Sequence, residues 1–428
     1  MDMFECKISG FFASNNFDTL GPSIESTTKA FLFDAYSGLE NDKLEYTQEM
    51  LPTWIQITPP TDKTVIVLDA GGTNFRSYLV KLENGKAKIL ESKKGSIPGS
   101  KGELTKEQFF SSIADSIEYL KDKAESIHFC FAYAINMTSE KDATVLRMSK
   151  EINVKGILNE LVGASLLKTL KDRGWKNIQN VFVLNDTVAA LLSGLSLNKP
   201  FSSYIGLILG TGLNIAYIES SDIPKLPVEQ KLLPQIIVCE TAKTNKIVAS
   251  DFDKILHTQV SDGDICKCEK MCSGAYLGKL ISICLVKACE QGLFSKNFAQ
   301  SLKPHEFSFQ DINEVLTGEV SAENQLALLC KDATAEDIKT INRIAGEILN
   351  RVARIVASAL SAIAIKSGAG KDKQHPICIV AEGTTFKKAF NLKQQIQKLL
   401  TENLTQKHQI YFELVEVEEA IVLGSAYF

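Results

Sequence analysis

Residues 65–80 read VIVLDAGGTNFRSYLV, in which two apolar runs flank a polar, glycine-containing group from Asp69 to Asn74. The second run continues as FRSYLVKLENGKAKIL and has strand character, so a strand follows the glycines. A P-loop NTPase has strand, glycine-rich loop and helix in that order, so this stretch is of another kind. Asn84-Gly85 then predicts a two-residue hairpin turn. The segment as a whole predicts an antiparallel meander.

A second copy of this pattern lies at residues 204–220, YIGLILGTGLNIAYIES. When the copies are aligned on Asn74 and Asn214, both have a strand, a glycine-containing turn, a glycine two residues before the asparagine, and a returning strand. The copies are 140 residues apart, which predicts a duplicated α/β domain with two tight turns facing each other across a cleft.

The two turns have the chemistry of a polyphosphate site. Glycines let backbone N–H groups approach an anion closely, and the hydroxyls of Thr73 and Thr211 add donors. The copies differ where Asp69 of the first corresponds to Leu209 of the second. A single carboxylate beside paired phosphate-binding turns predicts a bound Mg²⁺.

Strand-then-helix units recur at 181–195 (VFVLNDTVAALLSGL) and 376–390 (PICIVAEGTTFKKAF). The first strand ends at Asn185-Asp186, with a helix expected from Thr187. Ligands of open α/β sheets gather at the carboxyl ends of strands, so both units should point to the same cleft. Asp186 is a candidate general base there, and the alternative is that it only caps the following helix.

The bulk composition limits the classes of function. A chain of 428 residues exceeds what one core usually supports, so two lobes are expected. The net charge of −4 gives no basic excess for nucleic acid or an anionic membrane. The longest apolar run, 355–365, is shorter than the ~20 residues of a membrane span and predicts a buried helix. The N-terminus has no cationic region before an apolar core, so the predicted location is the cytoplasm.

Three cysteines cluster in CKCEKMC, at Cys266, Cys268 and Cys272. A zinc site normally has CxxC pairs with a distant second pair of ligands, and this spacing fits that pattern poorly. A second hypothesis is that the cluster makes the protein sensitive to oxidation, which unchanged activity after mild peroxide treatment would contradict.

Six motifs appear in the order and spacing of one known family, and the sequence therefore resembles the hexokinase family from residue 50 to the C-terminus: MLPTWIQITPP…VIVLDAGGTNFR, LRMSKEINVKG, VFVLNDTVAALLSG, IGLILGTGLNIAYI, CEKMCSGAYLGKL and VLGSAYF. The resemblance implies a duplicated actin-like ATPase (ribonuclease H-like) fold of the α/β class, with two lobes and a central cleft. The small lobe would comprise residues 61–188 with a C-terminal helix at 416–428, and the large lobe 189–415 with an N-terminal helical segment at 1–60.

The implied reaction is phosphoryl transfer from Mg-ATP to the 6-hydroxyl of a hexose, the first step of glycolysis, with glucose as the expected sugar. Asp186 would be the general base, Lys150 a second catalytic group, and Asp69 would hold Mg²⁺ through water. The implied sugar contacts are Ser149, Lys150, Asn185, Asp186, Asn214, Glu240 and Glu269. The implied nucleotide contacts are Asp69, Gly71, Gly72, Thr73, Asn74, Arg76, Gly210, Thr211, Gly212, Gly383, Thr384, Gly424 and Ser425. Small residues such as Gly424 and Ser425 also serve close helix packing, which is the alternative for that pair.

The chain departs from the family pattern at several contacts. Ala132 stands where the family usually has a serine that touches the sugar, and Glu240 lies in VCETAKTN, which lacks the usual Asn-Met-Glu-Trp-Gly pattern. Leu213 replaces a threonine, and Glu382 replaces an aspartate. The departures leave the preferred hexose open among glucose, mannose, fructose and an amino sugar.

Two alternatives from other classes remain at this level. A catalytically silent sugar sensor of the same fold would bind sugar without turnover, and an actin- or chaperone-like ATPase would hydrolyse ATP regardless of sugar. Asp69, Asp186 and Lys150 argue against the sensor, because a sensor needs neither a base nor a metal ligand. The expected assembly is a monomer or a homodimer.

Overall fold

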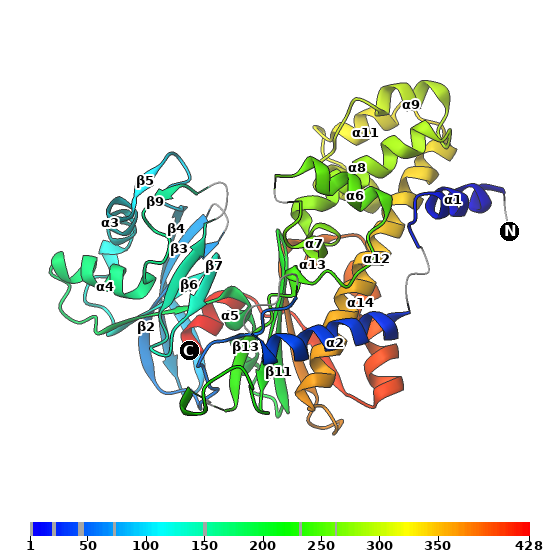
Figure 1. Cartoon of the computed structure of the whole chain (residues 1–428). Helices are drawn as coiled ribbons and strands as arrows, with labels where there is room; N and C mark the ends of the chain where they lie inside the picture. The colour runs from blue at the N-terminus through cyan, green and yellow to red at the C-terminus, as the bar shows by residue number, and fades with distance from the viewer. Residues whose placement is uncertain are drawn as a thin grey trace.

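The computed structural model describes residues 3–18, 23–41, 47–71, 74–148, 152–230, 233–261 and 263–428. Each of two lobes is built on one large sheet, and the lobes stand apart at one end and meet at the other (Figure 1). The smaller sheet contains β2 (Lys63–Gly71), β3 (Asn74–Glu83), β4 (Lys86–Ser96), β6 (Ser126–Phe131) and β10 (Asn180–Leu184). The larger sheet contains β1 (Leu51–Pro52), β11 (Ser203–Leu209), β12 (Leu213–Glu219), β13 (Gln235–Val238), β14 (Ile377–Glu382) and β15 (Phe412–Val415).

The two sheets have the same strand topology, which confirms the predicted duplication. In the smaller sheet the order is β10-β6-β2-β3-β4, with β2, β3 and β4 antiparallel and β6 and β10 parallel to β2. In the larger sheet β15-β14-β11-β12-β13 repeats that order and those directions, with β1 added at the edge. The hairpin turn at Asn84 and Gly85 is also confirmed, with φ of 52° and 71°.

Helices cover the sheets and join the lobes (Figure 1). The small lobe carries α3 (Lys106–Ile117) and α4 (Val162–Asp172), and two short ribbons, β5 (Leu104–Thr105) with β9 (Val154–Lys155) and β7 (Ala134–Met137) with β8 (Ala143–Arg147). At the junction lie α5 (Asp186–Ser193) and α15 (Ala420–Tyr427). The large lobe carries α1 (Met3–Ser14), α2 (Ile24–Glu40), α6 (Asp251–Gln259), α7 (Lys267–Lys270), α8 (Gly274–Glu290), α9 (Lys296–Leu302), α10 (Phe309–Thr317), α11 (Gln325–Cys330), α12 (Ala335–Ser367), α13 (Thr384–Lys388) and α14 (Leu392–Leu400).

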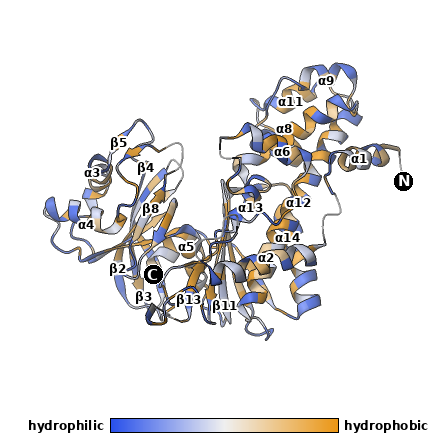
Figure 2. Ribbon diagram, viewed as in Figure 1, coloured by the Kyte–Doolittle hydropathy of each residue, from blue (hydrophilic) through white to orange (hydrophobic). Residues whose placement is uncertain are grey.

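The junction is a tightly packed apolar core in which α5 and α15 lie against each other. A Cβ on Gly424 of α15 would stand 1.7 Å from the carbonyl oxygen of Ala189 in α5, so only glycine permits this helix contact. Apolar residues of both sheets join this core, including Val67, Ala216 and Val238. Figure 2 shows the same apolar colouring along the strands of both lobes. The core fixes α5, whose first turn carries Asp186.

The predicted buried helix at 355–365 is confirmed as part of α12, but the length argument behind it is not sufficient. α12 has 33 residues and is long and apolar enough to cross a membrane, by length and composition. Its apolar window is 83% buried inside the structure, against the large sheet and its neighbouring helices. Burial therefore identifies α12 as the core helix of the large lobe.

Both chain ends contain less helix than the sequence predicts. α15 begins at Ala420 rather than at residue 416, because Glu419 has the left-handed conformation, with φ of 51°. In the N-terminal segment α1 and α2 are helical, whereas residues 47–60 contain no helix and supply β1 to the large sheet. The boundaries proposed for the two lobes stay a prediction.

Candidate active site

The first glycine-containing turn joins β2 to β3 and carries Asp69. Asp69 lies opposite Arg76 in the β2–β3 register, and the Arg76 Nη1 to Asp69 Oδ2 distance is 3.2 Å. Burial raises the pKa of Asp69, and the Arg76 guanidinium acts against that rise. Gly71 pairs with Asn74 across the turn. Gly72 and Thr73, which complete the predicted phosphate-binding turn, lie outside the described residues.

The second turn, residues 210–212, joins β11 to β12. The Gly210 N–H donates to the Gly212 carbonyl over 3.0 Å, which closes the turn. The Thr211 side chain is exposed. A Cβ on Gly212 would stand 2.6 Å from Glu269 Oε2, so this glycine lets the carboxylate approach the turn.

Gly383 and Thr384 lie directly beside this second turn. The atoms nearest to a Cβ built on Gly210 are Gly383 Cα at 3.5 Å and Thr384 N at 3.8 Å. Gly383 has φ of +115°, and its own Cβ would stand 2.3 Å from the Leu209 carbonyl oxygen. Glycine is therefore required here by conformation and by space. The loop after β14 therefore lies directly against the β11–β12 turn.

Asp186 is the first residue of α5, one position earlier than the predicted start of the helix, and Asn185 is the N-cap. The Asn185 Oδ1 accepts hydrogen bonds from the Thr187 N–H, over 2.9 Å, and from the Thr187 hydroxyl. The residue that caps α5 is therefore Asn185 and not Asp186. Asp186 Oδ1 also accepts a hydrogen bond from the Thr187 N–H, over 2.9 Å. Burial raises the pKa of Asp186 to about 7, helped by the charges of Asp69 and Glu240.

The predicted sugar contacts of the large lobe lie together at the start of β12. Asn214 Nδ2 donates to Glu240 Oε1 over 2.9 Å, and the Leu213 N–H donates to Glu269 Oε2 over 3.1 Å. Burial raises the pKa of both Glu240 and Glu269, and the Glu240 charge adds to the rise at Glu269. Glu269 is thus not a solvated helix carboxylate, which was the local alternative for it.

These groups form one electrostatic unit. The Asp69 and Glu240 charges both raise the pKa of Asp186, so the carboxylates of the first turn and of the large lobe are each within electrostatic range of Asp186 in α5. Several carboxylates that share a partly desolvated site have perturbed pKa values of the kind found at functional sites. The arrangement can accept hydroxyl protons and can position a polyhydroxylated ligand between Asp186 and Glu240.

Some predicted site residues are not brought to this group. Gly424 packs against α5, as described above, and Ser425 is fully buried. The Ser425 Oγ donates to the Ile421 carbonyl, and its own carbonyl oxygen hydrogen bonds with His128 Nδ1 at 2.6 Å. Their positions match the close-packing alternative. Ser149 and Lys150 lie outside the described residues.

The residues present are compatible with Mg²⁺ held by one protein carboxylate. Within the described ranges, no group of three or more His, Cys, Asp or Glu side chains is placed to hold a metal ion. Asp69 is a single carboxylate at the carboxyl end of β2, beside the glycine turn. A metal there would take its other ligands from phosphate and water, which is the usual state of Mg²⁺ at nucleotides.

The comparisons with known proteins fit this geometry. Residues 204–428, more than half of the chain, match a family model described as Hexokinase, and residues 13–195 match a second model with the same description. This chain belongs to the hexokinase family. It is similar to hexokinase-1 of Schizosaccharomyces pombe (30% identity over 286 residues, 63% of this chain and 58% of that protein) and to hexokinase-2 of Homo sapiens (28% over 373 residues, 82% and 40%). The chain thus spans about half the length of these relatives.

Solved structures establish the fold. The hexokinase from Schistosoma mansoni complexed with glucose superimposes with a TM-score of 0.80 at 21% identity, over 100% of this chain and 99% of that one. A ROK hexokinase from Thermus thermophilus gives a TM-score of 0.51 at 14% identity, over 85% and 97%. The chain therefore has the duplicated actin-like ATPase fold that the resemblance to hexokinases implied.

The sequence analysis did not identify three further features of this hexokinase-family site. Burial raises the pKa values of Glu240 and Glu269, and the charge of Arg147, at the end of β8, acts against that rise. Lys243 forms an ion pair with Glu49 beside Glu240, and the two partners are 194 residues apart. Thr385 donates its hydroxyl proton to the Gly210 carbonyl over 2.9 Å. The only sequence signals were Arg147 in the LRMSK motif and a second threonine after Gly383.

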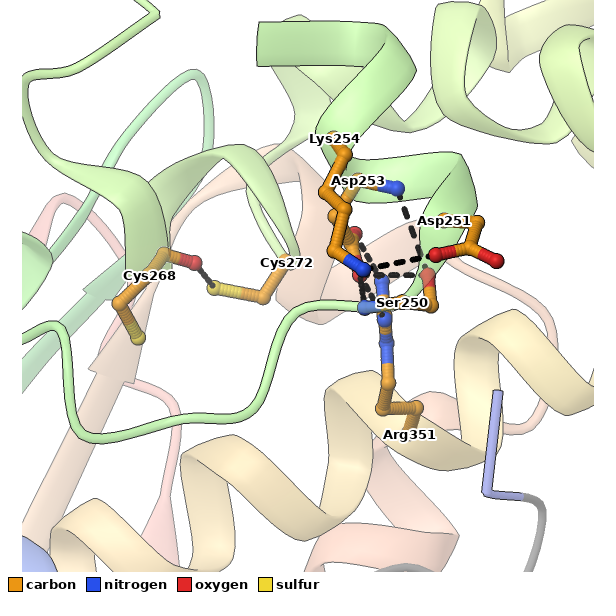
Figure 3. Close-up of polar contacts among 7 residues, drawn as sticks. All are labelled: Ser250, Asp251, Asp253, Lys254, Cys268, Cys272 and Arg351. Atoms are coloured by element: carbon orange, nitrogen blue, oxygen red, sulfur yellow. Dashed lines mark hydrogen bonds and ion pairs between the residues drawn. The ribbon is translucent and has the colours of Figure 1, made fainter. Parts of the chain in front are cut away.

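In the large lobe, a buried ion pair joins α12 to α6 (Figure 3). Arg351 of α12 donates to both carboxylate oxygens of Asp253 in α6, over 2.6 and 2.8 Å. In the cysteine cluster, Cys272 Sγ donates to the Cys268 carbonyl over 3.0 Å, and both side chains are buried. Burial and the Cys268 thiol raise the pKa of Cys272, which disfavours the reactive thiolate. The oxidation hypothesis stays a prediction with this physical argument against it.

Proposed function

We propose that this chain is an ATP-dependent hexokinase, which transfers the γ-phosphate of Mg-ATP to the 6-hydroxyl of a hexose. The observation that carries the proposal is Asp186, a carboxylate with its pKa raised to about 7, within electrostatic range of Asp69 at one glycine turn and of Glu240 at the sugar contacts. A base with a pKa near the working pH is well matched to taking a proton from a hydroxyl group.

In the proposed reaction, the 6-hydroxyl donates its proton to the Asp186 carboxylate while its oxygen forms a bond to the γ-phosphorus. The bond from the γ-phosphorus to the β-phosphate oxygen breaks, and ADP leaves. The Mg²⁺, when bound, neutralises phosphate charge, with Asp69 holding it through water.

The chain's other residues bind and orient the two substrates. N–H groups of the two turns would hold the phosphates, with Arg76 beside the first turn, and the loop at Gly383 and Thr384 would line the adenosine pocket. Glu240 and Glu269 would accept hydrogen bonds from sugar hydroxyls, and Asn214 fixes Glu240 through its 2.9 Å hydrogen bond. Glucose is the expected sugar, since glucose is named in the complex of the similar Schistosoma mansoni hexokinase.

The first experiment is ADP release from Mg-ATP in the presence of glucose, mannose, fructose and glucosamine, each supplied separately. The expected result is a rate that depends on one or two of these sugars. ADP release at the same rate without sugar would contradict the proposal and favour an ATPase. Sugar binding, measured by a rise in melting temperature, without any ADP release would contradict it in favour of a sugar sensor.

A further inference from the structure

The carbonyl group of Gly210, in the second turn, is held by two elements that come from distant parts of the sequence. The Gly274 N–H, at the start of α8, donates to Gly210 O over 2.8 Å, and the Thr385 hydroxyl of α13 donates to the same oxygen over 2.9 Å. Thr385 is 5% exposed, so its hydroxyl is shielded from competing water. The oxygen has two lone pairs, and both are therefore used.

There is little spare room where Gly210, Gly274 and Thr385 meet. A Cβ on Gly274 would stand 2.4 Å from Thr385 Oγ1 and 3.0 Å from Gly210 O. A glycine at 274 is therefore what allows the hydroxyl and the turn to approach each other. Thr385 also belongs to the short helix that Gly383 and Thr384 begin, so its hydrogen bond ties the two predicted nucleotide loops together.

This hydrogen bonding fixes the direction of the next N–H group. In a trans peptide unit the C=O and N–H bonds point to opposite sides. The Gly210 carbonyl points toward α8 and α13, so the Thr211 N–H points away from them, and Thr211 itself is exposed. Among the described residues, no backbone carbonyl accepts a hydrogen bond from the Thr211 N–H.

We propose that Thr385 is a positioning residue for the phosphates of the nucleotide: its hydroxyl, together with the Gly274 amide, orients the 210–211 peptide so that the Thr211 N–H is presented to an oxygen of the β- or γ-phosphate, which AMP lacks. This inference rests on the proposed function. The α13 hydroxyl thus acts on the nucleotide through the turn, and on its phosphates rather than on its base or on the sugar.

The test compares Thr385→Val, which keeps the shape and removes the hydroxyl, with Thr385→Ser, which keeps the hydroxyl. Dissociation constants for AMP, ADP and the ATP analogue AMPPNP, each with Mg²⁺, are measured by calorimetry. For Thr385→Val we expect AMPPNP and ADP to bind about three- to tenfold more weakly, the range of one lost hydrogen bond, and AMP and glucose to bind as before. Thr385→Ser should restore the binding of AMPPNP.

Thr340→Val is the matched control for the loss of a buried threonine hydroxyl. Thr340 is 1% exposed and donates to the Glu336 carbonyl over 2.8 Å, within α12. It should lower the melting temperature to a similar extent without changing nucleotide binding. Gly274→Ala, which would displace the Thr385 hydroxyl, should reproduce the selective loss of AMPPNP and ADP.

The outcomes separate the inference from the proposed function. Unchanged AMPPNP binding in Thr385→Val would overturn the inference alone, as would an equal loss of AMP and AMPPNP, or a loss in Thr385→Ser as large as in Thr385→Val. Failure of the unaltered chain to bind any of the three nucleotides would overturn the proposed function itself.

Discussion

The two glycine turns are equivalent in the duplicated fold but are held in different ways. In the first, the position after Asp69 is Ala70, whose carbonyl accepts a hydrogen bond from the Ala132 N–H over 3.0 Å. In the second, the position after Leu209 is Gly210, whose carbonyl accepts from both the Gly274 N–H and the Thr385 hydroxyl. One copy thus supplies a charge, the Asp69 carboxylate, and the other supplies a fixed backbone.

This difference shows how a duplicated fold can divide one task. The same backbone path supports the Asp69 carboxylate, proposed to hold Mg²⁺, in one copy, whereas Leu209 at the matching place in the other copy is fully buried. The following predictions test that division.

The largest effect is expected at Asp186, which both turns are proposed to serve. Asp186→Asn removes the base and keeps the shape, so kcat should fall by about 10²- to 10⁴-fold, the usual contribution of general base catalysis. Steady-state ADP release with glucose measures it. AMPPNP should still bind, since neither turn is altered. A kcat within threefold of the unaltered chain would contradict the role of Asp186.

The next effect should differ between the two copies. Asp69→Asn removes the carboxylate proposed to hold Mg²⁺ through water, and we expect kcat/KM for Mg-ATP to fall by about a hundredfold, or several kcal/mol of charge stabilisation. Leu209→Met changes the matching residue at nearly constant volume and should cost less than about threefold. Equal losses of kcat/KM in the two variants would contradict the proposed difference between the two turns.

A smaller effect is expected where the second turn meets the sugar contacts. Gly212→Ala places a methyl group 2.6 Å from Glu269 Oε2, so the carboxylate must move. The KM for the hexose should rise by about three- to tenfold, as for the loss of one hydrogen bond, with little change for ATP. Gly210→Ala is the matched control, because its Cβ would meet only ordinary contacts, at 3.5 Å and beyond. A larger sugar effect at 210 than at 212 would contradict this geometry.

The smallest effect concerns stability and pH. The pKa of Asp186 is raised from 3.8 to about 7, so between these values the folded chain binds more protons there than the unfolded chain does. Stability is therefore lost as pH rises through this window, and the loss is complete above pH 7. Asp186→Asn should melt a few degrees higher than the unaltered chain at pH 8 and at nearly the same temperature at pH 4.5. A shift of the same size at both pH values would contradict the raised pKa.

Local sequence signals predicted the parts of the fold that depend on neighbouring residues. Asn84-Gly85 predicted a hairpin because both residues tolerate positive φ, and the repeated strand-turn-strand pattern predicted the duplication. The placement of Asp69 and Glu240 within electrostatic range of Asp186 followed from the resemblance to hexokinases. No local pattern could have brought together residues so far apart.

The sequence could not predict which residues far apart in the chain pack against each other. The hydroxyl of Thr385 and the carbonyl of Gly210 are 175 residues apart, and neither has an unusual sequence context. Gly424 was assigned to the nucleotide because small residues suit both a ligand and a helix contact. Only the closeness of Ala189 in α5 distinguishes these two roles.

The most direct test of the account follows the fate of the γ-phosphate. The unaltered chain and Asp186→Asn are given ³²P-labelled ATP, Mg²⁺ and glucose, and the labelled products are separated. The account predicts label in a hexose 6-phosphate, formed at least about a hundredfold more slowly by the variant. Label that appears as inorganic phosphate regardless of sugar, or equally fast hexose phosphorylation by the variant, would contradict it.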